Sequence, residues 1–214
     1  MLKAYETIRQ KTTTELVEHK SRFIGNLMPA ASEEEAKEIV AKVSKQHRDA
    51  NHNCYAYRIN ETQLVEKYSD DGEPTQTAGM PMLDLLRTKN LINVVVVVTR
   101  YFGGVKLGTG GLVRAYTKTL QSALDQVTII KKDTYDLLRI TVPYTFAGKM
   151  DYYIKKEAIV VKDIQYEEEI HYELYTTDNN SLSLALVELT NGQSDIKKLG
   201  KVLGFIDRGK MYEE

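Results

Sequence analysis

Residues 94–116 have the sequence VVVVVTRYFGGVKLGTGGLVRAY, and this stretch decides the fold of the first half of the chain. Its five valines are β-branched and apolar on both faces of the pleat, so they predict a strand that is buried on both sides. From Leu112 to Val127 the apolar residues recur at helical spacing, with polar residues opposite them, which predicts a helix. A buried strand, a glycine-rich loop and a helix N-terminus therefore follow one another.

The loop contains five glycines, which are Gly103, Gly104, Gly108, Gly110 and Gly111. A loop of this kind before a helix offers unpaired backbone N–H groups to an anion. Three cations, Arg100, Lys106 and Arg114, lie in the same stretch. The combination indicates a candidate site for phosphate or for a nucleic-acid backbone.

The loop matches neither of two common nucleotide motifs. Gly103 and Gly108 have the spacing of a P-loop, but Thr109 follows where a P-loop has lysine. A dinucleotide fingerprint that starts at Gly108 has Val113 in place of its third glycine. Two interpretations stay open: the glycines provide positive φ and tight strand–helix packing, or the loop binds an anionic ligand.

Charge divides the 214-residue chain into two parts, although its net charge is only −1. Residues 1–132 contain 19 Lys and Arg against 15 Asp and Glu, which gives +4. Residues 133–214 contain 10 against 15, which gives −5. We therefore expect two domains, 1–132 and 133–214, of which the first is better suited to an anionic partner.

Cysteine usage and hydropathy indicate a cytoplasmic protein. Cys54 is the single cysteine, so no disulfide can form within the chain and a reducing compartment is expected. The N-terminus has no apolar signal core. The longest apolar stretch, residues 91–98, is too short to cross a bilayer, so no membrane partner is expected.

Periodicity and turn residues predict the elements of the first half. Strands are expected at 13–19, 22–28, 51–59, 63–69 and 94–98, helices at 32–47, 80–89 and 112–127, and an edge strand at 129–132. The polar segment 131–134 is the expected domain boundary.

The second half has the order strand, helix, strand, strand, helix, strand. The expected ranges are 135–142, 145–157, 159–166, 170–177, 181–190 and 197–205. This order is the ferredoxin-like split βαβ pattern. The fold class expected for the whole chain is α+β with two domains.

The predicted strand at residues 51–59 places polar groups on alternate faces. His52, Cys54 and Arg58 share one face, which could form a shallow anion site, and Tyr55 and Tyr57 share the other. A nucleophilic Cys–His pair is chemically possible. A lone cysteine of this kind is more often a small buried hydrophobic residue, and we expect that role here.

Three carboxylates, Asp70, Asp71 and Glu73, cluster within four positions. They could hold Mg²⁺, form an ordinary Asp-Asp-Gly turn, or contact the cations of the glycine-rich loop. Zinc is not expected, because one cysteine and four scattered histidines do not make a ligand set. Lys20 and Arg22 add two cations at a predicted hairpin turn, which matters only if this turn folds beside the loop.

Taken together, four blocks resemble the YigZ/IMPACT family. They are KSRF at 20–23, HNCYAYR at 52–58, SDDGEPT at 69–75 with TAG at 77–79, and RYFGG through LGTGGLVRAY at 100–116. These blocks cover the first half, and the second half is similar to the small C-terminal domain of bacterial members.

The resemblance implies a fold for each half of the chain and a process in which the protein acts. The first half should be the two-layer α/β unit shared with domain IV of elongation factor G, the RNase P protein and GHMP kinases. The second half should be ferredoxin-like, as in domain V of elongation factor G. Eukaryotic relatives regulate translation by competing for an activator of a kinase that phosphorylates an initiation factor, partly through an N-terminal domain absent from this sequence. The resemblance provides no catalytic residues.

Our first hypothesis is a non-catalytic, translation-associated regulatory protein that binds RNA, the ribosome or a translation factor. The expected binding residues are Arg58, Arg100, Gly103, Gly104, Lys106, Gly108, Thr109, Gly110, Gly111, Arg114, His52, Lys20 and Arg22. Tyr55, Tyr57 and Tyr101 could stack on unpaired bases. No cofactor or metal is expected, and the sequence does not indicate an oligomeric state.

Two other hypotheses remain. The chain could be an enzyme for a nucleotide or small phosphorylated substrate, with Asp70, Asp71 or Glu73 holding Mg²⁺ or acting as a base. It could also be a protein-interaction module without an anion site.

Overall fold

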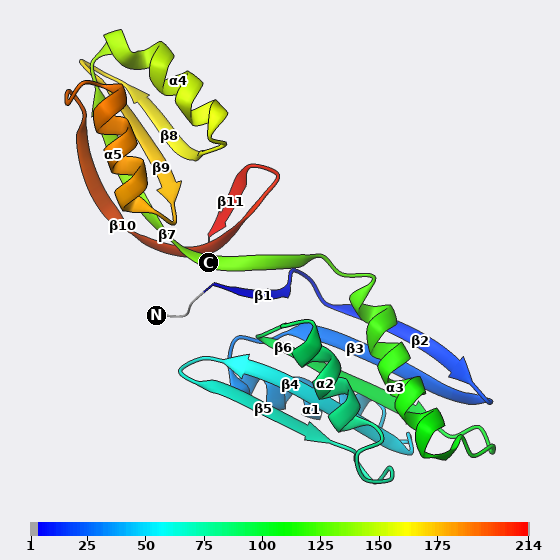
Figure 1. The fold of residues 1–214 in the computed structure, drawn as a ribbon. Coiled ribbons are helices and arrows are strands. Elements are labelled where there is room, and N and C mark those ends of the chain that lie inside the picture. The colour runs from blue at the N-terminus through cyan, green and yellow to red at the C-terminus, as the bar shows by residue number, and fades with distance from the viewer. Residues whose placement is uncertain (1–3, 214) are drawn as a thin grey trace. The chain divides into compact units, whose positions relative to one another are not determined.

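The computed structural model describes residues 4–213, which form two compact units, residues 4–130 and residues 131–213 (Figure 1). Each unit combines an antiparallel sheet with helices, so the α+β fold class with two domains is confirmed. None of the helices in this range combines the length and hydropathy that a membrane span requires.

The first unit is built on a five-stranded sheet in the order β2-β3-β6-β4-β5. The strands are β2 (Thr12–Glu18), β3 (Ser21–Pro29), β4 (His52–Asn60), β5 (Leu64–Ser69) and β6 (Val94–Tyr101), and all neighbours are antiparallel. The valines of β6 have no exposed surface, which confirms the predicted buried strand at the centre.

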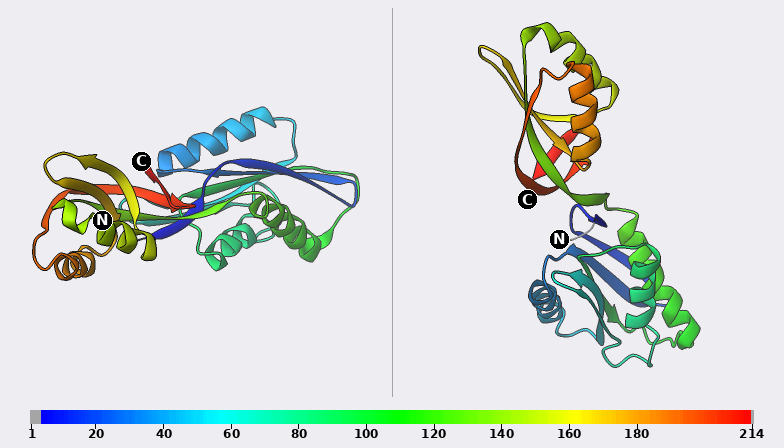
Figure 2. Two further views of the ribbon diagram at one scale, coloured as in Figure 1. Left: turned by 90° about the horizontal axis from the view of Figure 1, so that it is seen from above. Right: turned by 60° about the vertical axis from the view of Figure 1, so that its left-hand side comes forward.

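Helices cover both faces of this sheet (Figure 2). The helix α1 (Glu33–Gln46) packs on Val95 and Val97, whereas α2 (Gly79–Thr88) and α3 (Gly108–Leu124) cover the face of Val94, Val96 and Val98. The alternation of side chains along β6 thus supplies two cores. The two-layer arrangement implied by the resemblance is extended here by a helical layer on the second face.

The start of α1 follows from its sequence. Ser32 Oγ accepts a hydrogen bond from the N–H of Glu35, and the carboxylate of Glu35 accepts one from the N–H of Ala31. This arrangement is close to a capping box, but the carboxylate accepts from Ala31, the residue before the N-cap, rather than from Ser32 itself.

The second unit has a sheet in the order β11-β10-β7-β9-β8. Its elements are β7 (Ile129–Val142), a short 3₁₀ turn (Tyr144–Phe146), α4 (Ala147–Lys156), β8 (Val160–Tyr166), β9 (Ile170–Thr176), α5 (Asn179–Leu189), β10 (Asp195–Asp207) and β11 (Lys210–Glu213). The central order β10-β7-β9-β8 is that of the ferredoxin-like fold. Both helices pack on one face, where Met150 and Leu186 meet the strand residues Leu138 and Tyr172.

Several boundaries differ from the sequence-based prediction. The expected edge strand at 129–132 and the polar segment 131–134, which is the expected domain boundary, are both part of β7, which begins at Ile129 in the first unit. The strands β1 (Tyr5–Ile8) and β11 were not predicted, since four residues are too few for a clear alternation. The helix α3 begins at Gly108, four residues before its apolar pattern starts.

Candidate anion-binding site

The register of the first sheet brings the predicted site segments to one end. Arg100, near the end of β6, lies opposite Phe23 of β3 and His52 of β4. A Cβ atom at Gly103 would overlap with the backbone of the turn at Lys20. The Lys20 turn therefore packs directly against the glycine-rich loop, which is the condition under which its cations become relevant.

The first part of the loop is engaged in internal hydrogen bonds. The N–H of Phe102 donates to Asn51 Oδ1 over 2.8 Å, and the N–H of Gly103 donates to Ser21 Oγ over 3.2 Å. Gly103 thus has a packing role, and its N–H is not free to meet an anion. Gly104 is exposed and has a φ of 83°, a conformation that glycine adopts at little cost.

The open backbone lies at the start of α3. Its first turn consists of Gly108, Thr109, Gly110 and Gly111, and no side chain caps it. The first three of these residues are exposed. An uncapped helix start presents N–H groups and the positive end of the helix dipole to whatever lies outside it. The predicted anion-binding geometry therefore resides in the helix rather than in the loop before it.

Exposed cations surround this helix start. Lys20, Lys106 and Arg114 are exposed, and within residues 4–213 none of them forms an ion pair. A hollow of about 250 Å³ beside α3 is lined in part by Glu18, His19, Arg114 and Lys118. Arg22 is also exposed, but its Nε donates to Glu15 over 2.9 Å. The positive charge therefore comes mainly from the loop and from α3.

Arg58, which was predicted to bind an anion, is buried and engaged elsewhere. It is 7% exposed. Its Nε donates to Glu66 over 2.7 Å, and its Nη1 donates to the carbonyl oxygens of Leu86 and Leu91. A buried guanidinium needs such partners, and here they tie β4 to β5 and to α2. Arg58 therefore stabilises the fold.

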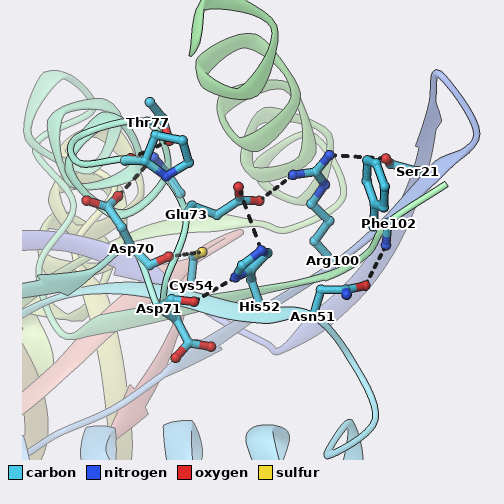
Figure 3. A network of polar contacts seen from close by, with 12 residues as sticks. Ser21, Asn51, His52, Cys54, Asp70, Asp71, Glu73, Thr77, Arg100 and Phe102 are labelled. Carbon is cyan, nitrogen blue, oxygen red and sulfur yellow. Dashed lines mark hydrogen bonds and ion pairs between the residues drawn. The ribbon is translucent and has the colours of Figure 1, made fainter. Parts of the chain in front are cut away.

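Glu73 is the centre of a buried polar network (Figure 3). Its Oε1 accepts hydrogen bonds from Arg100 Nη1 over 2.7 Å and from the hydroxyl of Tyr116 over 2.8 Å. Arg100 Nη2 donates to Ser21 Oγ over 3.2 Å, and His52 Nε2 lies 3.9 Å from Glu73 Oε2. Arg100, predicted as an exposed anion ligand, is only 5% exposed and neutralises this carboxylate.

The other two carboxylates of the acidic cluster shape the turn. Asp70 accepts hydrogen bonds from the backbone N–H groups of Gln76, Ala78 and Gly79, at 2.7 to 3.0 Å. Asp71 accepts one from the N–H of Asn53, and its carbonyl oxygen lies 2.7 Å from His52 Nδ1 (Figure 3). Of the three alternatives for the cluster, turn chemistry therefore holds for Asp70 and Asp71, and contact with a loop cation holds for Glu73.

Within the part of the chain that the structure describes, no three potential ligands from His, Cys, Asp and Glu come together in a suitable group.

Cys54 is buried and has no exposed surface. Its thiol donates to the carbonyl oxygen of Asp70 over 3.0 Å and contacts the hydroxyl of Tyr116 over 3.3 Å. Burial raises the pKa of Cys54 well above its ordinary value, since the thiolate loses its hydration. The thiol is therefore unsuited to nucleophilic attack and fits the predicted packing role.

Two of the tyrosines considered for base stacking lie away from the start of α3, and the hydroxyl of the third is hydrogen-bonded. Tyr55 and Tyr57 stack on each other on the α1 face, and Tyr57 is 3% exposed. The hydroxyl of Tyr101 contacts His47 and Asp49. Neither Tyr55 nor Tyr57 lies on the face of α3.

Sequence reasoning missed four residues of this region: Ser21, Asn51, Phe102 and Lys118. Lys118 lies one turn after Arg114, and this spacing on a polar helix face was a usable signal. The roles of Ser21 and Asn51 depend on strand register, and no local pattern could have indicated them. Phe102 is 46% exposed beside the loop and is the aromatic residue best placed for stacking there.

Comparisons with known proteins support the division into two units. The model of the Impact N-terminal domain matches residues 19–124, and the model called Domain of unknown function (DUF1949) matches residues 140–193. A protein of Bacillus subtilis, IMPACT family member YvyE, is 41% identical over 200 residues, which are 92% of each chain. The chain belongs to the IMPACT family.

Other matches agree with this membership. Protein IMPACT of Rattus norvegicus is 36% identical over 98 residues, which are 44% of this chain and 30% of that IMPACT family member. A solved structure described as a hypothetical protein has a TM-score of 0.59 and 27% identity, and the match covers 94% of this chain and 99% of that one. The resemblance predicted from the four sequence blocks is therefore confirmed.

Proposed function

We propose that this IMPACT family member is a translation-associated regulatory protein whose first unit binds RNA phosphates of the translation machinery, without catalysis. The observation that carries the proposal is the uncapped, exposed start of α3 beside the unpaired cations Lys106 and Arg114. Helix N-termini and lysine or arginine side chains are the groups that commonly contact nucleic-acid phosphates.

Family membership supports the link to translation, because the resemblance includes eukaryotic members that regulate this process. The similarity to Protein IMPACT is confined to 98 residues, and the Impact N-terminal domain match includes the whole glycine-rich loop and α3. A role of this kind places the protein in the cytoplasm, as expected from its cysteine usage.

The proposal contains no catalytic step because the carboxylates are already engaged. Asp70 and Asp71 are bound to backbone N–H groups, and Glu73 is bound to Arg100 and Tyr116. Removing Glu73 or Arg100 would break a buried ion pair, so neither is a suitable variant for testing binding.

The test combines Lys106→Ala, Arg114→Ala and Lys118→Ala in one variant and measures its binding to purified ribosomes and to single-stranded RNA. The control combines Lys42→Ala, Lys45→Ala and Lys67→Ala, which are exposed lysines of α1 and β5. Both variants lose three positive charges. We expect the variant at Lys106, Arg114 and Lys118 to bind more weakly at low salt. The slope of log K against log salt, which is negative, should become less steep by about 1 for each phosphate that is no longer neutralised.

Equal binding by both variants would reject the site. Binding that persists in high salt and requires a protein component would instead identify a protein partner and reject the RNA proposal.

A further inference from the structure

A second hollow, of about 410 Å³, lies between the acidic turn, the glycine-rich loop and the start of α3. Its polar lining is formed by His52, Glu73, Arg100, Lys106 and Thr109. Its apolar lining is formed by Pro74, Phe102, Leu107 and Leu112. The volume is that of a small-molecule site, about 300–1,000 Å³. The mixed lining suits a ligand that carries a charged group on an apolar or aromatic body.

The polar lining favours a negative group. The uncapped start of α3 borders the hollow at Gly108, where a Cβ atom would meet no other atom within 4 Å. The backbone therefore faces open space at the positive end of the helix dipole. Lys106 adds an unpaired charge, whereas the charge of Arg100 is balanced by Glu73.

An unsatisfied donor provides independent evidence for a ligand. The side chain of Arg100 is 6% exposed, and its two terminal nitrogens donate to Glu73 and Ser21. Its Nε–H is buried and is one of two buried side-chain polar groups without a partner in the described residues. A buried donor without an acceptor is unfavourable, and Arg100 is one of the residues that line the hollow, so an acceptor oxygen that reaches its Nε–H would be stabilised there.

The apolar lining favours an aromatic body. Phe102 is 46% exposed, and its ring centre lies 5.4 Å from the guanidinium carbon of Arg100. The cation therefore holds the ring beside the hollow, while Phe102 as a residue stays 46% exposed. Nucleic-acid bases stack on exposed rings of this kind.

We propose that this hollow binds a nucleoside monophosphate, with the phosphate at the start of α3 and the base against Phe102. This site shares Lys106 and the start of α3 with the RNA surface proposed above and adds Phe102 to it, whereas Arg114 and Lys118 line the other hollow.

The experiment is calorimetric titration of the full chain with adenosine monophosphate, adenosine and inorganic phosphate. We expect saturable binding of adenosine monophosphate and at least tenfold weaker binding of each half. Equal binding of inorganic phosphate would overturn the role of the base. Absence of binding by all three probes at millimolar concentration would overturn the site.

Two further measurements distinguish binding at this site from general effects of a substitution on the protein. Phe102→Leu should weaken the binding of adenosine monophosphate by at least about fivefold, whereas Tyr68→Leu, which removes another exposed ring, should leave this binding unchanged. In ¹⁵N NMR the Nε–H resonance of Arg100 should shift on addition of adenosine monophosphate, and an unchanged resonance would contradict the proposal. Unaltered RNA binding by Phe102→Leu, together with weaker binding of adenosine monophosphate, would show that the RNA surface does not use the aromatic part of this site.

Discussion

At the scale of single residues, the close approach of Gly103 to the turn at Lys20 decides how the site is assembled. No other residue fits, because any Cβ atom would enter the backbone of the turn. The same glycine gives its N–H to Ser21, so the loop and the hairpin are fixed to each other twice.

We therefore expect Gly103→Ala to lower the free energy of unfolding by about 2–3 kcal/mol, since the backbone must move to relieve the overlap. The control is Gly110→Ala, where the nearest outside atom would lie 3.6 Å away and alanine favours the helix. Urea unfolding of both variants measures the difference. A Gly103→Ala protein as stable as Gly110→Ala would mean that the loop is not packed on the turn.

At the scale of elements, the edge strand β5 is fixed by one carboxylate. Glu66 accepts hydrogen bonds from Arg87 of α2 and from Arg58 of β4, at 2.5 to 3.0 Å. The hydrogen bonds from Arg87, followed by the one from Arg58, hold the pKa of Glu66 below its usual value. The single side chain thus joins a strand, its neighbour and a helix.

This pKa predicts a pH dependence. A carboxylate with a lowered pKa in the folded state contributes stability that is full above its unfolded pKa, about 4.3, and is lost as pH falls through the folded pKa. Glu66→Gln should therefore cost about 2 kcal/mol at pH 7 and progressively less as pH falls below about 4.3. Unfolding measured between pH 7 and 3 tests this, with Glu61→Gln as an exposed control. A cost that does not change with pH would contradict it.

Elements with strong local patterns were the ones that the sequence could predict. The valines of β6 and the apolar period at 32–47 each carry their own signal, and the strand and the helix that they predict are confirmed. The first turn of α3 could not be predicted, since Gly108–Gly111 have no apolar period and low helix propensity. The polar segment 131–134, which we expect as the domain boundary, is part of β7, because polar residues also suit the exposed positions of a strand.

The sequence indicated which residues lie near the loop, but not which of them are free to bind a ligand. Lys106 is exposed, whereas the N–H of Gly103 donates to Ser21. Arg100 is engaged by partners 27 and 79 positions away, and Arg58 by partners 8 to 33 positions away. Sequence charge does not reveal whether a cation already has a buried partner.

At the scale of the whole molecule, each unit has its own hydrophobic core. Leu120 of α3 has no exposed surface in the first, and Leu138 of β7 has none in the second. We propose that the two units are separate folding domains, with their limit at residues 130–132. This limit lies close to the point where the net charge changes sign.

Two core variants test this division. Leu120→Ala and Leu138→Ala should each cost about 2–5 kcal/mol, because each leaves a cavity in one core. In differential scanning calorimetry each variant should lower the transition of its own unit and leave the other in place. A single transition that both variants shift equally would show that the two units unfold as one.

The buried network around Glu73 also has a consequence for the time at which the first unit becomes complete. Its partners Ser21, Arg100 and Tyr116 are supplied by segments that are synthesised far apart, and contacts across such separations close late in folding. A nascent chain that ends before Tyr116 has the sheet strands but lacks one of the two strong donors to Glu73. The carboxylate of Glu73 can become permanently buried only after α3 has been synthesised. The region that we assign to binding is therefore the last part of the first unit to reach its folded structure.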